Sequence, residues 1–171
     1  ILAAIGEISR FPSAKQLVGY AGLGARVHAS GETYATGRIT KAGRKELRWA
    51  MVEAARHAVL DHAHWKSEYE RLSACIGQKK AIVAIARKLL VVVWHLLTKQ
   101  AADKFANPVQ VVCSMFAFAH RVRVKNLPNG MSALQFTRAQ MDRLGIGQNV
   151  LVVPWGTKSF KLPPSKLAEK K

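Results

Sequence analysis

Acidic residues and cysteines are scarce in this sequence. It holds 10 Asp and Glu against 27 Lys and Arg, which leaves a formal net charge of +17. A compact chain with this charge repels itself, and nucleic acid is the most common polyanion that would neutralise it. Cys75 and Cys113 are isolated, without C-x-x-C spacing, so a zinc site and a disulfide framework are excluded and a reducing cytoplasm fits.

The sequence also lacks a long uninterrupted apolar run. The longest, from Ala81 to Leu97, contains Arg87 and Lys88 and is shorter than the ~20 residues that a membrane span needs. It predicts a buried core helix and no membrane association. Because the chain starts with Ile1 and an apolar helical pattern without a charged leader, we expect a fragment or a truncated open reading frame.

What is present predicts a mainly α fold. An apolar fraction of 49% in 171 residues is enough for a core. Apolar residues recur at helical spacing, and a Gly/Ser/Thr-rich segment at 25–40 has no helical period and predicts an extended loop or a small hairpin. We expect a compact helical domain over residues 1–102, with helices at about 1–9, 13–20, 42–64, 65–75 and 79–102.

Residues 103–171 predict a mixed C-terminal extension. The run VQVVCSMFAFAHRVRVK is rich in β-branched and aromatic residues and fits either a strand or a helix. The segment SALQFTRAQMDRLGI has an amphipathic helical pattern that ends at Gly145. The tail PWGTKSFKLPPSKLAEKK is rich in Pro and Lys and is expected to be mobile.

A basic cluster surrounds the expected start of the helix at 42–64. Cations at a helix N-terminus oppose the helix dipole, so a basic first turn calls for a counter-ion such as phosphate. A solvated helix face is the alternative. Together with Arg26 in the preceding segment, the cluster predicts a nucleic-acid-binding surface made of Arg26, Arg38, Lys41, Arg44, Lys45 and Arg48.

Ser30 precedes Gly31 in the loop directly upstream of this cluster. A serine hydroxyl needs help to become a nucleophile, and Arg26, Arg38 and Arg48 are candidates to stabilise charge on a phosphoryl transition state. From these residues alone an ordinary Ser-Gly turn remains the stronger interpretation. Nearby His28 is a further candidate participant, and Tyr34 is a rival nucleophile in the same loop.

Metal chemistry has little support in the sequence. His57 and Asp61 have i, i+4 ligand spacing, but there is no H-E-x-x-H motif and no clear third ligand. The acidic residues do not form an obvious set of four for two-metal catalysis. We expect no metal site and no cofactor in this chain.

One long segment resembles a known family. The run RFPSAKQLVGYAGLGARVHASGETYATGRITKAGRKELRWAMVEAARHAV is similar to the C-terminal transposase domain of the IS-one-ten family of insertion sequences. That family's pattern is approximately F-x-S-x-x-x-L-x-x-Y-x-G-L, then S-G, then R-I-T-K-x-G-N-x-x-L-R and an alanine-rich helix. The resemblance covers roughly residues 1–100 and departs from the pattern at Gly24, where Pro is usual, and at Arg44, where Asn is usual.

The resemblance implies a DNA recombinase of the DEDD type. An N-terminal domain of this family, with an RNase-H-like fold, holds magnesium through four acids, and this chain has no counterpart of it. The family's serine nucleophile corresponds to Ser30. Some members are guided by a bridge RNA, and DNA, such a guide RNA and further protomers in a homo-oligomer are the implied partners.

These features lead to three alternative functions. The first is the DNA-binding, serine-bearing portion of an insertion-sequence transposase, acting in strand cleavage and exchange at the ends of a mobile element. The second is a non-catalytic basic nucleic-acid-binding module from a truncated or decayed copy. The third is a helical oligomerisation domain whose apolar helix at 79–102 packs between chains.

Overall fold

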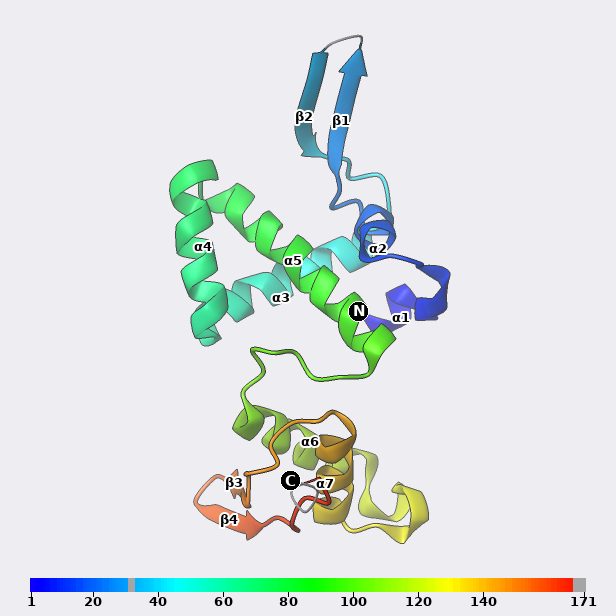
Figure 1. Cartoon of the computed structure of the whole chain (residues 1–171), viewed down its shortest axis with the longest axis vertical. Coiled ribbons are helices and arrows are strands. Elements are labelled where there is room, and N and C mark those ends of the chain that lie inside the picture. Colours follow the sequence, from blue (N-terminus) through cyan, green and yellow to red (C-terminus); the bar gives the residue numbers. More distant parts are fainter. Residues whose placement is uncertain (31–32, 168–171) are drawn as a thin grey trace. The chain divides into compact units, whose positions relative to one another are not determined.

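The computed structural model describes residues 1–30 and 33–167, and only the backbone of residues 27–30 and 33–36. The chain divides into two compact units, Ile1–Lys99 and Gln100–Lys171. Helices dominate both (Figure 1), which confirms the expected mainly α class.

The first unit is a helical body that carries one β-hairpin. A short helix and a 3-10 turn begin it, and a two-stranded antiparallel sheet interrupts the helices. The elements are α1 (Leu2–Ile5), η1 (Ile8–Arg10), α2 (Ala14–Tyr20), β1 (Ala25–Ser30), β2 (Thr33–Ile39), α3 (Lys45–Asp61), α4 (Ala63–Ile76) and α5 (Gln78–Lys99). Of the loop and the hairpin left open for residues 25–40, the hairpin is therefore right.

Helix α5 is the central element of this unit. Ala81, Ile85, Ala86 and Leu90 are fully buried and together cover a wide part of the helix circumference, and α5 contacts α2, α3 and α4. Among the described helices it alone is long and apolar enough to cross a membrane. Here its buried face packs into the unit's core, and the indole of Trp94 donates a hydrogen bond to the carbonyl of Phe11 at 2.8 Å.

A charged cluster joins α4 to α5. The carboxylate of Glu68 accepts two hydrogen bonds from Arg71, at 2.8 and 3.0 Å, and a third from the Lys88 ammonium on α5. Hydrogen bonds from Arg71 first, and then from Lys88, lower the pKa of Glu68 from 4.5 to about 2. The carboxylate therefore stays ionised and holds the two helices together across almost the whole acidic range.

The second unit packs two helices against another small hairpin. Its elements are α6 (Pro108–Val122), η2 (Val124–Asn126), η3 (Pro128–Gly130), α7 (Ala133–Arg143), β3 (Val152–Trp155) and β4 (Lys158–Lys161). The segment that fitted strand or helix is a helix, because Asn107 caps it, accepting from the Val109 amide at 2.9 Å, and Pro108 occupies its first turn. Val112, Phe116 and Ala119 form its buried face.

A buried arginine organises the end of this unit. The Arg138 guanidinium donates to the carbonyls of Pro163 at 2.7 Å, Gly147 at 3.0 Å and Val150. Asp142, one turn further along α7, accepts from the Ser165 hydroxyl at 2.7 Å. The expectation of a mobile tail from Pro154 onward is therefore wrong as far as Ser165, because these side chains and the β3–β4 pairing fix the segment in place.

Candidate nucleic-acid interface

The root of the β1–β2 hairpin is fixed by backbone hydrogen bonds. The amides of Thr40, Lys41 and Arg44 donate to the carbonyls of Gly24, Gly22 and Tyr20, at 2.8, 3.1 and 2.8 Å. Gly43 permits this close approach, since a Cβ there would lie 2.3 Å from the Tyr20 carbonyl oxygen. The two segments that flank the hairpin are thus held side by side on the helical body.

Arg48 strengthens the same root from α3. Its Nη1 donates to the carbonyls of Ala21 at 3.0 Å and Lys41 at 3.1 Å. Gly22 leaves room for the guanidinium, because a Cβ at Gly22, where φ is +67°, would lie 2.7 Å from Nη1. Arg48 is therefore partly committed to structure, and only its remaining donors are available to a phosphate.

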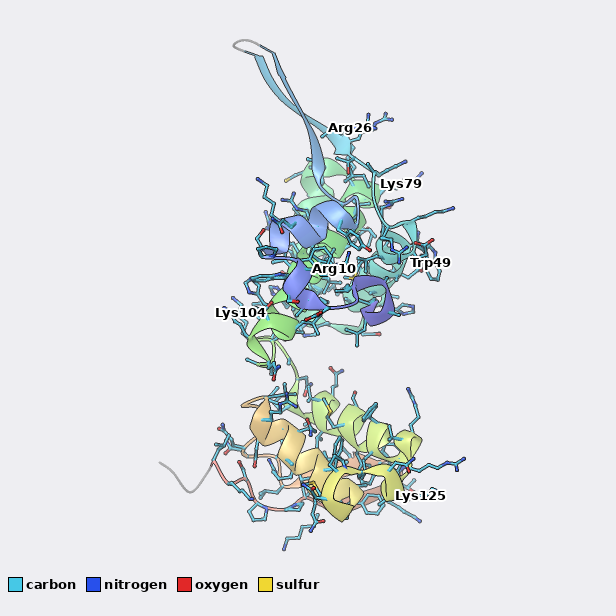
Figure 2. All side chains as sticks on the ribbon, turned by 90° about the vertical axis from the view of Figure 1, so that its right-hand side faces the viewer. Arg10, Arg26, Trp49, Lys79, Lys104 and Lys125 are labelled. Atoms are coloured by element: carbon cyan, nitrogen blue, oxygen red, sulfur yellow. The ribbon has the colours of Figure 1, made fainter. Side chains whose placement is uncertain are left out.

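The other predicted cations are exposed around this root. Arg26 lies near the start of β1 and Arg38 near the end of β2, and Figure 2 shows Arg26 where the hairpin meets the body. Among the described residues, no carboxylate lies within 4.0 Å of the predicted cations other than Arg48, which are five in number. The set forms a surface suited to a polyanion, which we call the hairpin root: Arg26, Arg38, Lys41, Arg44 and Lys45.

The sequence predicted helical turns for Lys41, Arg44, Lys45 and Arg48, and for the first two of them the structure differs. Helix α3 begins at Lys45, with Arg44 as its N-cap, rather than at Ala42. Lys41 has a φ of +55° and Gly43 a φ of +154°, so the chain is not helical there. The reason is that the hydrogen bonds from the Lys41 and Arg44 amides to the carbonyls of Gly22 and Tyr20 hold this segment in a non-helical conformation, so the helix starts after it.

Ser30 lies at the opposite end of the hairpin from the root. It is the last residue of β1 and pairs with Thr33 in the strand register. Ser30 lies four positions after Arg26, which corresponds to about 13 Å along a strand. The side chains of Ser30, His28 and Tyr34 fall outside the described part, so the structure gives their backbone register alone.

One exposed aromatic residue near the root was not anticipated. Trp49, one turn after Lys45 on α3, is 66% exposed and projects from the helical body in Figure 2. The signal in the sequence is its position two residues after the buried Leu47, off the face that Leu47, Met51 and Ala55 share. A flat apolar side chain beside cations is typical of surfaces on which bases stack.

The described residues offer no metal site. No three His, Cys, Asp or Glu side chains among them lie close enough to hold an ion. The described part of the chain therefore does not fit a magnesium-binding group.

The net charge and the exposed cations at the hairpin root predict a nucleic-acid-binding domain, and comparisons with known proteins point to one family. Residues 1–70 match the model of the Transposase IS116/IS110/IS902 family. This part of the chain is therefore similar to a transposase domain of that family, in line with the resemblance seen in the sequence.

Two curated relatives extend the similarity beyond residue 70. The chain is 35% identical over 105 residues to the transposase for insertion sequence element IS1111A of Coxiella burnetii, an alignment that covers 58% of this chain and 29% of the relative. It is 35% identical over 103 residues to the pilin gene-inverting protein of Moraxella bovis, covering 57% of this chain and 31% of the relative. The chain thus spans about three tenths of their length. No solved structure matches it significantly.

Proposed function

We propose that this chain is the DNA-binding, serine-bearing portion of an insertion-sequence transposase, which acts in strand cleavage and exchange at the ends of a mobile element in the cytoplasm. The observation that carries the proposal is the hairpin root: five exposed cations at the anchored base of a β-hairpin, within a domain of the transposase family. Cations in this arrangement neutralise backbone phosphates and fix the register of DNA.

In this proposal Ser30 is the nucleophile. Its oxygen attacks a DNA phosphorus while its proton passes to a base; the bond from phosphorus to the leaving deoxyribose oxygen breaks, and that oxygen takes up a proton. A phosphoserine ester conserves the bond energy for rejoining. Since Ser30 lies about 13 Å from Arg26 along the strand, the root would contact phosphates about four steps along a duplex from the one attacked.

The nucleophile is tested by Ser30→Ala in the transposase that carries this sequence. We expect recombination and the covalent protein–DNA adduct to disappear, while the dissociation constant for element-end DNA changes less than about twofold, because one neutral hydroxyl contributes little to phosphate binding. Ser67→Ala, at an exposed site on α4, is the matched control and should recombine normally. An active Ser30→Ala enzyme would exclude Ser30, and Tyr34→Phe would then be examined.

The DNA-binding surface is tested by salt dependence. Replacing Lys41, Arg44 and Lys45 with Gln removes three exposed cations, each worth about 0.9 in the slope of log K against log salt if it contacts a phosphate. We expect the slope to fall by about two to three. The control replaces three exposed lysines elsewhere in the first unit, Lys15, Lys66 and Lys99, and should leave the slope nearly unchanged. Equal effects would mean that DNA binds to net charge alone.

The second candidate is a non-catalytic nucleic-acid-binding module from a truncated or decayed copy. The exposed cations of the hairpin root support this candidate as well, because binding to a phosphate backbone needs no nucleophile. An upstream reading frame that encodes four spaced acids, which would bind magnesium, would argue for the first candidate. A stop codon or frameshift there would argue for the second. A guide RNA and further protomers are partners that we propose only with the first candidate.

A further inference from the structure

The second unit contains an apolar pocket that the transposase domain does not explain. Its volume is about 540 Å³. Helix α6, the start of α7 and both strands of the β3–β4 hairpin contribute to its walls. It is lined by Phe116, His120, Val124, Ser132, Ala133, Leu134, Trp155 and Phe160.

Aromatic rings meet on one side of this pocket. The Phe116 ring lies 4.6 Å from the His120 ring and 5.2 Å from the Trp155 ring, centroid to centroid and nearly edge to face in both cases. Phe160 lies 5.4 Å from Phe116. Phe116 is buried and braces the cluster, whereas Trp155 is 42% exposed and presents aromatic surface to a ligand.

The surroundings of the pocket are positively charged. Lys158 pairs with Trp155 across the β3–β4 hairpin, so the two side chains lie on the same face of it. Arg123 and Lys125 flank Val124, a wall residue, and both are exposed; Figure 2 shows Lys125 at the surface of this unit. Of the acids in the described part of the unit, Asp142 is bonded to Ser165, and neither it nor Asp103 lines the pocket.

We propose that this pocket binds an unpaired base of a single-stranded nucleic acid, with the adjacent phosphates on Lys158, Arg123 and Lys125. An exposed indole with Lys158 on the same hairpin face and two further cations flanking the pocket wall matches the two parts of a nucleotide, a flat apolar base and an anionic phosphate. A purely apolar peptide would leave the cations unused. The proposal does not depend on Ser30 or on the transposase domain, so the two stand or fall separately.

The test measures the affinity of the whole chain for single strands of about twelve nucleotides, as DNA and as RNA of the same sequence, and for the duplex. We expect Trp155→Ala to weaken single-strand binding about tenfold and duplex binding less than twofold. Trp155→Phe should retain most of the affinity. The matched control is Phe118→Ala, which removes an exposed aromatic from α6 outside the pocket and should bind normally.

The phosphate contact is tested in parallel. Lys158→Gln should lower the single-strand salt slope by about 0.7. Lys161→Gln, on the opposite face of the same hairpin, should leave the slope unchanged.

Equal affinity for DNA and RNA supports recognition through the base, and a preference for RNA supports RNA as the occupant with an added contact to the 2′-hydroxyl.

Wild-type single-strand affinity in a folded Trp155→Ala variant, checked by its melting curve, would overturn the proposal. Concentration-dependent dimerisation that Trp155→Ala abolishes, together with unchanged single-strand binding, would overturn it in favour of a second copy of the chain.

Discussion

Individual polar side chains stabilise segments of this protein that make few apolar contacts. Arg138 is the clearest case, because it binds three carbonyls of the C-terminal segment and lies 3.7 Å from the Asp142 carboxylate. Arg138→Met keeps the apolar volume, leaves those three carbonyls without their donor and removes the positive charge beside Asp142. We expect the free energy of unfolding of the second unit to fall by about 3–5 kcal/mol in urea titrations. Arg143→Met, at an exposed site on the same helix, is the control and should cost less than about 1 kcal/mol; similar losses would refute the role of Arg138.

Glu68 gives a second prediction, about pH. Its pKa is lowered to about 2 in the folded protein by Arg71 and Lys88. A lowered folded-state pKa means that the carboxylate stabilises the fold fully above its ordinary pKa, near 4.5, and that this contribution is lost as the pH falls towards 2. Glu68→Gln should therefore lower the melting temperature at pH 7 and reduce the loss of stability between pH 5 and pH 2. A mutant with the wild-type acid profile would show that the cluster is screened by solvent.

For single residues, the sequence showed where the charges lie but not which hydrogen bonds the charged side chains make. It identified the cations of the hairpin root, but it could not indicate that Arg48 bonds to the backbone of Ala21 and Lys41. Nor does the string SALQFTRAQMDRLGI distinguish the buried Arg138 from the exposed Arg143. In both cases the partners are carbonyls, which every residue has, so the sequence carries no sign of them.

Among the elements, the β1–β2 hairpin depends most on its glycines. Gly43→Ala would bring a Cβ to 2.3 Å from the Tyr20 carbonyl oxygen and open the root. We expect a loss of about 1–3 kcal/mol of stability and weaker DNA binding, measured by thermal melting and by titration with duplex DNA. Gly24→Ala is the matched control, because the nearest atom to its Cβ would be 4.0 Å away. Comparable losses at the two sites would argue against the close approach as the cause.

Elements with a strong apolar period were predicted with nearly correct bounds, and those defined by tertiary contacts were not. The expected helices at 65–75 and 79–102 correspond to α4 and α5. The start of α3 moved to Lys45 because of the anchored root. The β3–β4 hairpin was missed because its Lys- and Pro-rich sequence has little apolar alternation; it is held by packing on α6 and by the bond from Cys113 to the Pro154 carbonyl.

At the scale of the whole molecule, each unit has a hydrophobic core of its own. We therefore expect residues 1–99 and 100–171, expressed separately, each to fold cooperatively, since a buried core of this size supports an independent domain. The summed circular dichroism spectra of the two pieces should reproduce the helical signal of the intact chain, and each piece should melt cooperatively. A piece that remains unfolded alone would show that its stability comes from the other.

The candidate sites also differ in how far the whole sequence could reveal them. Ser30 and the hairpin root lie in a contiguous segment that resembles a known family, so a linear pattern was enough to propose them as sites. The aromatic pocket joins Phe116 to Trp155 and Phe160, about forty residues further along the chain. Such a site exists only once the second unit has folded.

The fold of the second unit depends on the segment around residues 162–165, so a truncation before this segment would destabilise the whole unit. A nonsense mutation just before the codon for Leu162 would delete the acceptor at Pro163 and the hydroxyl at Ser165, together with a buried leucine. The shortened product would keep the first unit intact and expose the remnant of the second unit to proteases. A truncation that spares nearly all of the helices and strands would thus still remove the fold of the second unit.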